Sequence, residues 1–85
     1  MSKQNNKTPQ EISLIKMRWI NDSHDVIFPS DHTRAAQQWC KQNCEPWEWT
    51  LEKWVHAYSH VMSFQNPVHA RDFEIYMNKL TEKQT

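Results

Sequence analysis

The stretch Trp39–Phe64, WCKQNCEPWEWTLEKWVHAYSHVMSF, decides how the rest of the chain is interpreted. It holds both cysteines, four of the five tryptophans and two of the five histidines in the 85 residues. Its cysteines and histidines nearly match a zinc-binding pattern, whereas its aromatic residues suit a hydrophobic junction between two similar halves of the chain. The two interpretations differ in secondary structure, because paired zinc-binding histidines require a helix where the junction requires a strand.

The zinc hypothesis involves Cys40, Cys44, His56 and His60. Their spacing, Cys-x3-Cys-x11-His-x3-His, resembles a zinc finger with two cysteine and two histidine ligands, which hold the metal tetrahedrally. The chain departs from that motif, because the central spacing is short, the glycine-containing turn between the cysteines is missing and Cys40 falls within a predicted helix. We therefore predict no cofactor and no metal site, and keep these four residues as the alternative.

Composition excludes several classes of partner and enzyme. Ten Lys and Arg residues balance ten Asp and Glu residues, whereas duplex nucleic acid requires clustered cations to neutralise its phosphates. The chain has no glycine, so the glycine-rich loops of nucleotide-binding enzymes are excluded. It also lacks the long apolar run of a membrane span and the apolar core of a signal peptide. We expect a cytoplasmic protein with reduced thiols.

The N-terminal half predicts a leader followed by two strands. Residues 1–10 are polar and predict a flexible leader, which leaves residues 11–82 as a single small domain. The mostly alternating apolar residues of Ile12–Ile20 favour a first strand. A second strand is expected at Val26–Phe28, where Pro29 ends it.

Two helices are also expected, one in each half of the chain. Ser30 or Asp31 can cap the first helix, which ends within 43–46. Asn66 followed by Pro67 starts the second, because proline fits the first helical position. The apolar sides comprise Ala35, Ala36, Trp39 and Cys40 in the first helix and Ala70, Phe73, Tyr76, Met77 and Leu80 in the second.

Residues 47–58 fit either a strand or a helix, because their aromatic residues satisfy both periodicities. An internal comparison favours the strand, since the two halves align at offsets of 35 to 37 residues. The aligned pairs are Trp19 with Trp54, Phe28 with Phe64, Trp39 with Tyr76 and Cys40 with Met77.

The predicted fold is therefore α+β. Two ββα units form an antiparallel sheet of about four strands, with both helices packed on one face. The alternative is a mostly α fold with residues 47–62 as a central helix.

The candidate binding residues come from the aromatic stretch. Five tryptophans are more than one small core needs, and an exposed tryptophan is a common interface anchor. No catalytic signature surrounds Cys44, so we predict neither catalytic residues nor enzyme activity. The residues expected to bind a partner are Trp47, Glu48, Trp49, Glu52 and Trp54.

The expected function is that of a non-enzymatic protein-interaction or inhibitor-type protein. In its size and its lack of glycine and catalytic motifs, the chain is similar in style to accessory and inhibitor proteins carried by phages and mobile elements. The expected partner is another protein or a second copy in a homodimer, rather than duplex nucleic acid or a membrane. The alternatives are a zinc-stabilised module and a binder of single-stranded nucleic acid, whose bases would stack on exposed tryptophans.

Overall fold

The computed structural model describes residues 7–56 and 58–83, with the side chains of residues 53–56 and 83 left aside. The fold class is α+β, as predicted. Its helices and strands are α1 (Pro9–Trp19), β1 (His24–Pro29), α2 (Thr33–Asn43), β2 (Trp49–His56), β3 (Ser59–Phe64) and α3 (Pro67–Lys83). Three short 3-10 helices connect them: η1 (Ile20–Asp22), η2 (Ser30–His32) and η3 (Pro46–Glu48).

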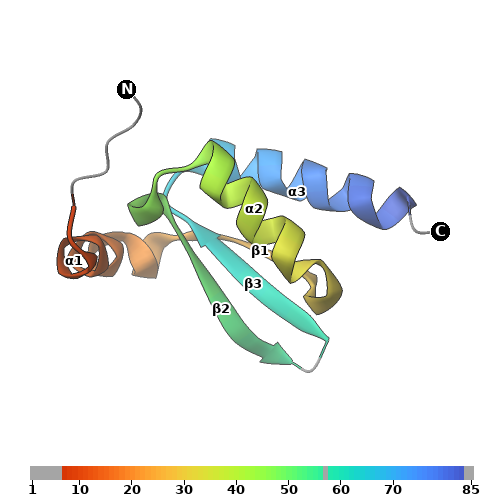
Figure 1. Ribbon diagram of the computed structural model, residues 1–85. Helices are drawn as coiled ribbons and strands as arrows, with labels where there is room; N and C mark the ends of the chain where they lie inside the picture. The colour runs from red at the N-terminus through yellow and green to blue at the C-terminus, as the bar shows by residue number, and fades with distance from the viewer. Residues whose placement is uncertain (1–6, 57, 84–85) are drawn as a thin grey trace.

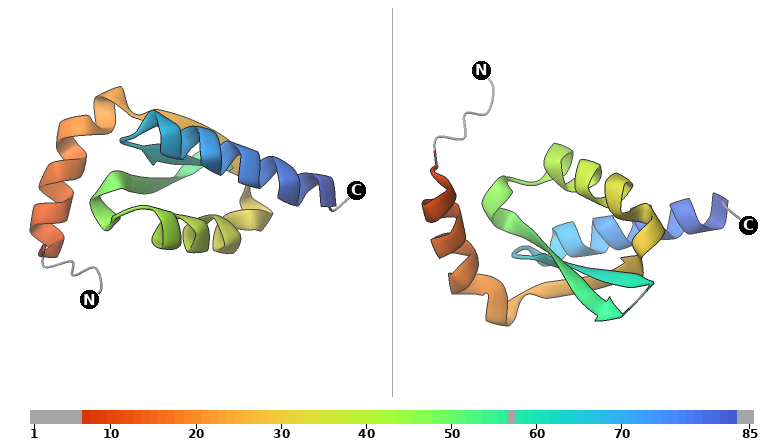
Figure 2. Two further views of the ribbon diagram at one scale, coloured as in Figure 1. Left: turned by 90° about the horizontal axis from the view of Figure 1, so that it is seen from above. Right: turned by 60° about the horizontal axis from the view of Figure 1, so that its bottom comes forward.

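The sheet is antiparallel, with strand order β1-β3-β2, so β3 is the central strand. Helices α2 and α3 cover one face of this sheet (Figure 1). Helix α1 stands apart from them at one end of the sheet (Figure 2). Among the described residues, no helix combines the length and the apolar composition of a membrane crossing.

Two predictions about the strands are wrong. The stretch Ile12–Ile20 does not form a strand, because it lies in α1 and the first residue of η1. The sheet therefore has three strands in the described residues, where about four were expected. The alternative of a central helix over 47–62 is also wrong, since that stretch forms η3, β2 and most of β3.

A capping box explains why α1 forms. The Thr8 side chain accepts the Glu11 backbone N–H at 3.1 Å, and the Glu11 carboxylate accepts the Thr8 N–H at 2.9 Å. Pro9 occupies the first turn, where its missing N–H costs nothing. These local hydrogen bonds satisfy backbone N–H donors that the start of a helix otherwise leaves unpaired. Helix α1 begins at Pro9, two residues before the expected start of the folded domain at residue 11.

Among the residues that the structure describes, the chain changes direction without left-handed backbone. No described residue has a positive φ, which agrees with the absence of glycine from the sequence. Three of the connections between elements are 3-10 helices, and the third, η3, begins with Pro46 after Glu45. The Glu48 side chain accepts the Glu45 N–H at 2.8 Å and stabilises that turn.

The core is centred on the ring of Phe73 in α3. Its centroid lies 5.6 Å from Phe28 in β1, 5.5 Å from Trp39 in α2 and 5.2 Å from Phe64 in β3. The interplanar angles of 53° to 84° are the edge-to-face and tilted arrangements that aromatic quadrupoles favour. One helical residue therefore joins both helices to two strands.

The strand–helix parts of the two halves correspond in space. β1 pairs with β3 so that His24 lies opposite Phe64, and Phe28 lies opposite His60. This register is symmetric, because each strand carries a histidine four residues before a phenylalanine. The helices that follow run in roughly opposite directions (Figure 1), as a pseudo-two-fold axis between β1 and β3 requires.

The correspondence ends before these strands, so only the second half forms one of the two predicted ββα units. Trp19 ends a helix, whereas its aligned partner Trp54 lies in β2. The first half is helix, strand, helix, and the second is strand, strand, helix. The aligned pair Trp39 and Tyr76 does stack, with centroids 6.3 Å apart and planes 26° apart.

The central position of Phe73 predicts a large loss of stability on truncation. Phe73→Ala is expected to lower the free energy of unfolding by about 3–5 kcal/mol, because a cavity replaces contacts to three rings. The exposed neighbour provides the control, and Glu74→Ala should stay within about 0.5 kcal/mol of wild type. Urea unfolding followed by tryptophan fluorescence measures both, and equal effects would contradict this account of the core.

Candidate functional site

Helix α1 is fixed to the rest of the fold by its last residue. The buried Trp19 donates its indole N–H to the backbone oxygen of Trp47 at 2.9 Å. Two lysine ammonium groups lie over tryptophan rings, with Lys7 4.6 Å from the Trp47 centroid and Lys16 5.8 Å from Trp49. These contacts place α1 over η3 and the start of β2.

The inward stripe of α1 is only partly apolar. Ile12, Ile15 and Trp19 repeat at helical spacing and are half-buried or buried, and half-buried Lys16 shares their side. Burial lowers the pKa of Lys16, because desolvation disfavours the charged ammonium. The Trp49 ring under that ammonium offsets part of this cost through a cation–π contact.

The opposite side of α1 exposes two large apolar residues. Leu14 is 57% exposed and Met17 is 67% exposed. Residues three apart are neighbours on a helix surface, so the two side chains form one patch. We call this patch the α1 surface.

Shallow hollows flank Leu14 on both sides. The first has a volume of about 220 Å³ and the second about 520 Å³. Lys7, Glu11 and Arg18 place charges on the first hollow, whereas the second has no charged lining residue. The lining residues are Lys7, Glu11, Leu14, Ile15 and Arg18 for the first and Pro9, Gln10, Ser13 and Leu14 for the second.

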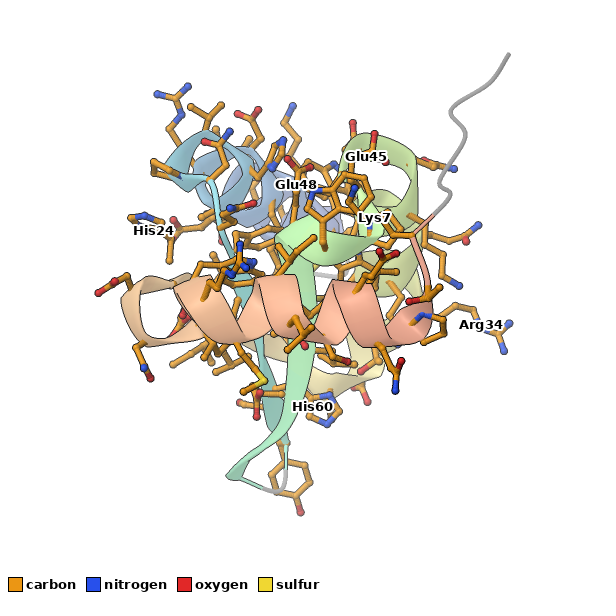
Figure 3. The ribbon with its side chains drawn as sticks, turned by 90° about the vertical axis from the view of Figure 1, so that its left-hand side faces the viewer. Lys7, His24, Arg34, Glu45, Glu48 and His60 are labelled. Atoms are coloured by element: carbon orange, nitrogen blue, oxygen red, sulfur yellow. The ribbon has the colours of Figure 1, made fainter. Side chains whose placement is uncertain are left out.

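The predicted binding residues do not form one exposed patch. Trp47 and Trp49 are half-buried, and Trp49 packs against the core. The Glu48 carboxylate accepts the Glu45 N–H and so caps η3 (Figure 3). Glu52 is exposed on β2, but it lies opposite Val61 and on the other face of the strand from Trp49.

The fifth predicted binding residue, Trp54, has a side chain outside the described ones. Sequence reasoning missed the α1 surface because it assigned this segment to a strand. Thr8, Pro9 and Glu11 carried the signal that could have identified the helix, since they match the capping-box pattern with proline at the first position.

The zinc candidates lie at two ends of α2. Cys40 and Cys44 are at its C-terminal end, whereas His60 contacts its first residue, Thr33. Cys40 lies seven positions after Thr33 in α2, or about 10 Å along the axis, whereas zinc ligands lie about 2 Å from the metal. The side chain of His56 is outside the described residues, and among the others no group of three or more ligands could hold a metal.

The two cysteines interact with each other in the core. Both are free and buried, and the hydrogen bond to Cys44 raises the pKa of the Cys40 thiol well above its usual range. Desolvation by burial and the charge of Cys44 raise it further. Cys40 therefore stays a neutral thiol at neutral pH, although nucleophilic attack and metal binding both require a thiolate.

The ring of His60 links the sheet to the start of α2. The Thr33 hydroxyl donates to the Ser30 carbonyl oxygen at 2.7 Å and lies 3.1 Å from His60 Nδ1. Since the hydroxyl has one proton, Nδ1–H must be the donor to the Thr33 oxygen. The His60 ring also packs edge-to-face with the Phe28 ring, with 6.0 Å between centroids. His60 therefore has a packing role.

The open face of the sheet carries no aromatic residue among the described side chains. Alternation along the strands places Trp49, Met62 and Phe64 on the covered face. Proteins that stack nucleic-acid bases on a sheet require aromatic rings on its open face. The residues that alternation places on the open face are Asp25, Ile27, Thr50, Glu52, Val61 and Ser63, and of these Ser63 is buried.

The chain was compared with families, characterised proteins and structures. No family model, curated protein or solved structure matches it.

Buried, hydrogen-bonded thiols predict slow chemical labelling. Iodoacetamide at about pH 8 should modify native Cys40 and Cys44 at least about tenfold more slowly than the urea-unfolded protein. Mass spectrometry of the labelled protein measures both rates. Rapid modification of either native thiol would contradict the packing described here and would reopen a nucleophilic role.

The raised pKa of Cys40 also predicts a loss of stability at alkaline pH. The folded thiol stays protonated, whereas the unfolded thiol ionises near its usual value of 9.0. The stabilising contribution is therefore complete below that value and declines as the pH rises above it. Urea unfolding at pH values around 9 should show a steeper decline for wild type than for Cys40→Ala, and parallel curves would refute this coupling.

Proposed function

We propose that this protein is a non-enzymatic protein-binding module whose docking site is the α1 surface. The observation that carries the proposal is the exposure of Leu14 and Met17 on a helix whose other side is already anchored. Isolated exposed apolar residues are common, but two neighbours beside two hollows form a compact apolar contact area.

The chemistry of the surroundings suits a protein partner. Leu14 forms a ridge between the hollows, so a partner can place an apolar side chain on either side of it. Lys7 and Arg18 add two positive charges to the first hollow against one negative charge on Glu11. Glu11 also accepts a backbone bond in the capping box. A partner with apolar protrusions flanked by acidic residues would complement this surface.

The interior residues favour binding over catalysis. Cys40 is held as a neutral thiol, and His60 donates its Nδ1–H to the Thr33 hydroxyl oxygen. A cysteine nucleophile needs a lowered pKa and a nearby base, and the raised pKa of Cys40 is the opposite condition. These observations support a non-enzymatic role.

The test compares capture by wild type with capture by a variant of the α1 surface. Proteins retained from a cell lysate by the immobilised chain are identified by mass spectrometry, and the recovered protein is then produced and titrated by calorimetry. Leu14→Glu should weaken its binding by at least about tenfold, because the substitution places a charge at the centre of an apolar contact.

The control is Ile27→Glu, which changes an equally exposed apolar residue on the open face of the sheet. This variant should bind as wild type does, and circular dichroism should show both variants folded. Binding that is insensitive to Leu14→Glu would exclude the α1 surface. Recovery of nucleic acid without protein would exclude the proposed function itself.

A further inference from the structure

A second exposed stripe runs along α3, on the side away from the core. The buried residues Ala70, Phe73 and Met77 face the sheet and α2. Val68 and Ile75, by contrast, are 50% and 48% exposed. Residues spaced alternately by four and three lie on one line along a helix. This line, which we call the α3 stripe, comprises Val68, Asp72, Ile75 and Lys79.

The middle of the α3 stripe is shaped for contact. A hollow of about 270 Å³ is lined by Asp72, Ile75, Tyr76 and Lys79. Two apolar side chains thus lie at its centre, with an acidic residue towards the N-terminus and a basic residue towards the C-terminus. The Tyr76 ring is supported from beneath by its stack on Trp39, which limits its freedom to move.

This arrangement is complementary to itself. Positions 72 and 79 are equally far from the midpoint between positions 75 and 76. A two-fold axis through that midpoint, perpendicular to α3, therefore places Asp72 of one copy opposite Lys79 of the other, and does so twice. The same operation places Ile75 opposite Tyr76. A two-fold interface requires such self-complementarity, because the same patch must serve both subunits.

We infer that two copies of this chain associate through the α3 stripe, with their α3 helices packed antiparallel. Asp72 carboxylates pair with Lys79 ammonium groups across the interface, and Ile75 and Tyr76 fill its centre. The occupant is a second copy because one helix supplies both halves of the charge pattern. This surface is separate from the α1 surface of the proposed function.

The charged residues of the α3 stripe, Asp72 and Lys79, make few ionic contacts within one chain. Asp72 lies 3.9 Å from Arg71 Nε, and both side chains are more than half exposed. Among the described residues, Lys79 makes no ion pair. Both are therefore available to a partner, although exposed pairs of this kind add more to orientation than to affinity.

Access to the stripe is open. The C-terminal end of α3 extends beyond α2 and the sheet in Figure 1 and in the view from above in Figure 2. A straight helix of this kind can meet its copy along several turns. Association would also bury apolar surface that a chain of 85 residues has little means to bury alone.

The test is a charge swap followed by sedimentation equilibrium. Wild type is expected to form dimers at concentrations between roughly 10 μM and 1 mM, the range of modest interfaces. Asp72→Lys and Lys79→Asp should each weaken dimerisation by about tenfold, because each creates two like-charge contacts. The double variant Asp72→Lys/Lys79→Asp restores both pairs and should dimerise as wild type does.

Two further variants separate this inference from the proposed function. Ile75→Glu should abolish dimerisation and leave binding at the α1 surface unchanged, whereas Leu14→Glu should leave dimerisation unchanged. Circular dichroism establishes that each variant is folded. A wild-type protein that stays monomeric at about 1 mM would overturn the inference, as would a double variant that fails to recover.

Discussion

The contacts of the Phe73 ring are the constraint on which the fold depends. This one side chain meets aromatic rings from β1, α2 and β3 within 5.6 Å between centroids. Because those rings come from distant parts of the chain, their contact with Phe73 fixes both helices on the same face of the sheet. The central strand β3 can then hold fully buried Met62 and Phe64 beneath them. A small chain gains most from such a shared centre, since it has little other interior.

Helix α1 is held differently. Trp19 is buried but lies outside the cluster formed by the core residues, and its indole N–H donates to the Trp47 backbone oxygen in η3. The remaining inward contacts include Lys16, whose ammonium is partly desolvated. Elements with few buried apolar contacts open more easily than core elements, and binding surfaces are often drawn from them. The position of α1 at the end of the sheet therefore suits an element that meets a partner.

The two surfaces that we propose are separate, and the sequence alone located neither. Trp47 and Trp49 drew attention as binding residues because tryptophans are frequent interface anchors, yet both pack beneath α1. Both tryptophans pack against α1, and the alternating apolar residues of α1 had predicted a strand there. Leu14 and Met17 contribute to this wrong prediction, because apolar residues on the outer side of a helix weaken the 3.6-residue repeat of its hydrophobic pattern. Apolar residues that the core does not bury, such as Leu14 and Met17, are the feature that suggests a contact surface.

The sequence by itself determined the elements whose signals are local. Asn66 and Pro67 start α3, and Pro29 ends β1, because capping bonds and the missing proline N–H act within a few residues. The repeat of strand and helix was also visible in sequence, since aligned side chains occupy equivalent core positions. Only tertiary structure decided that 49–56 is a strand, because its periodicity fits two structures and pairing with β3 selects one. It also decided that Cys40 and His60 lie at opposite ends of α2, since spacing along a chain does not determine distance in space.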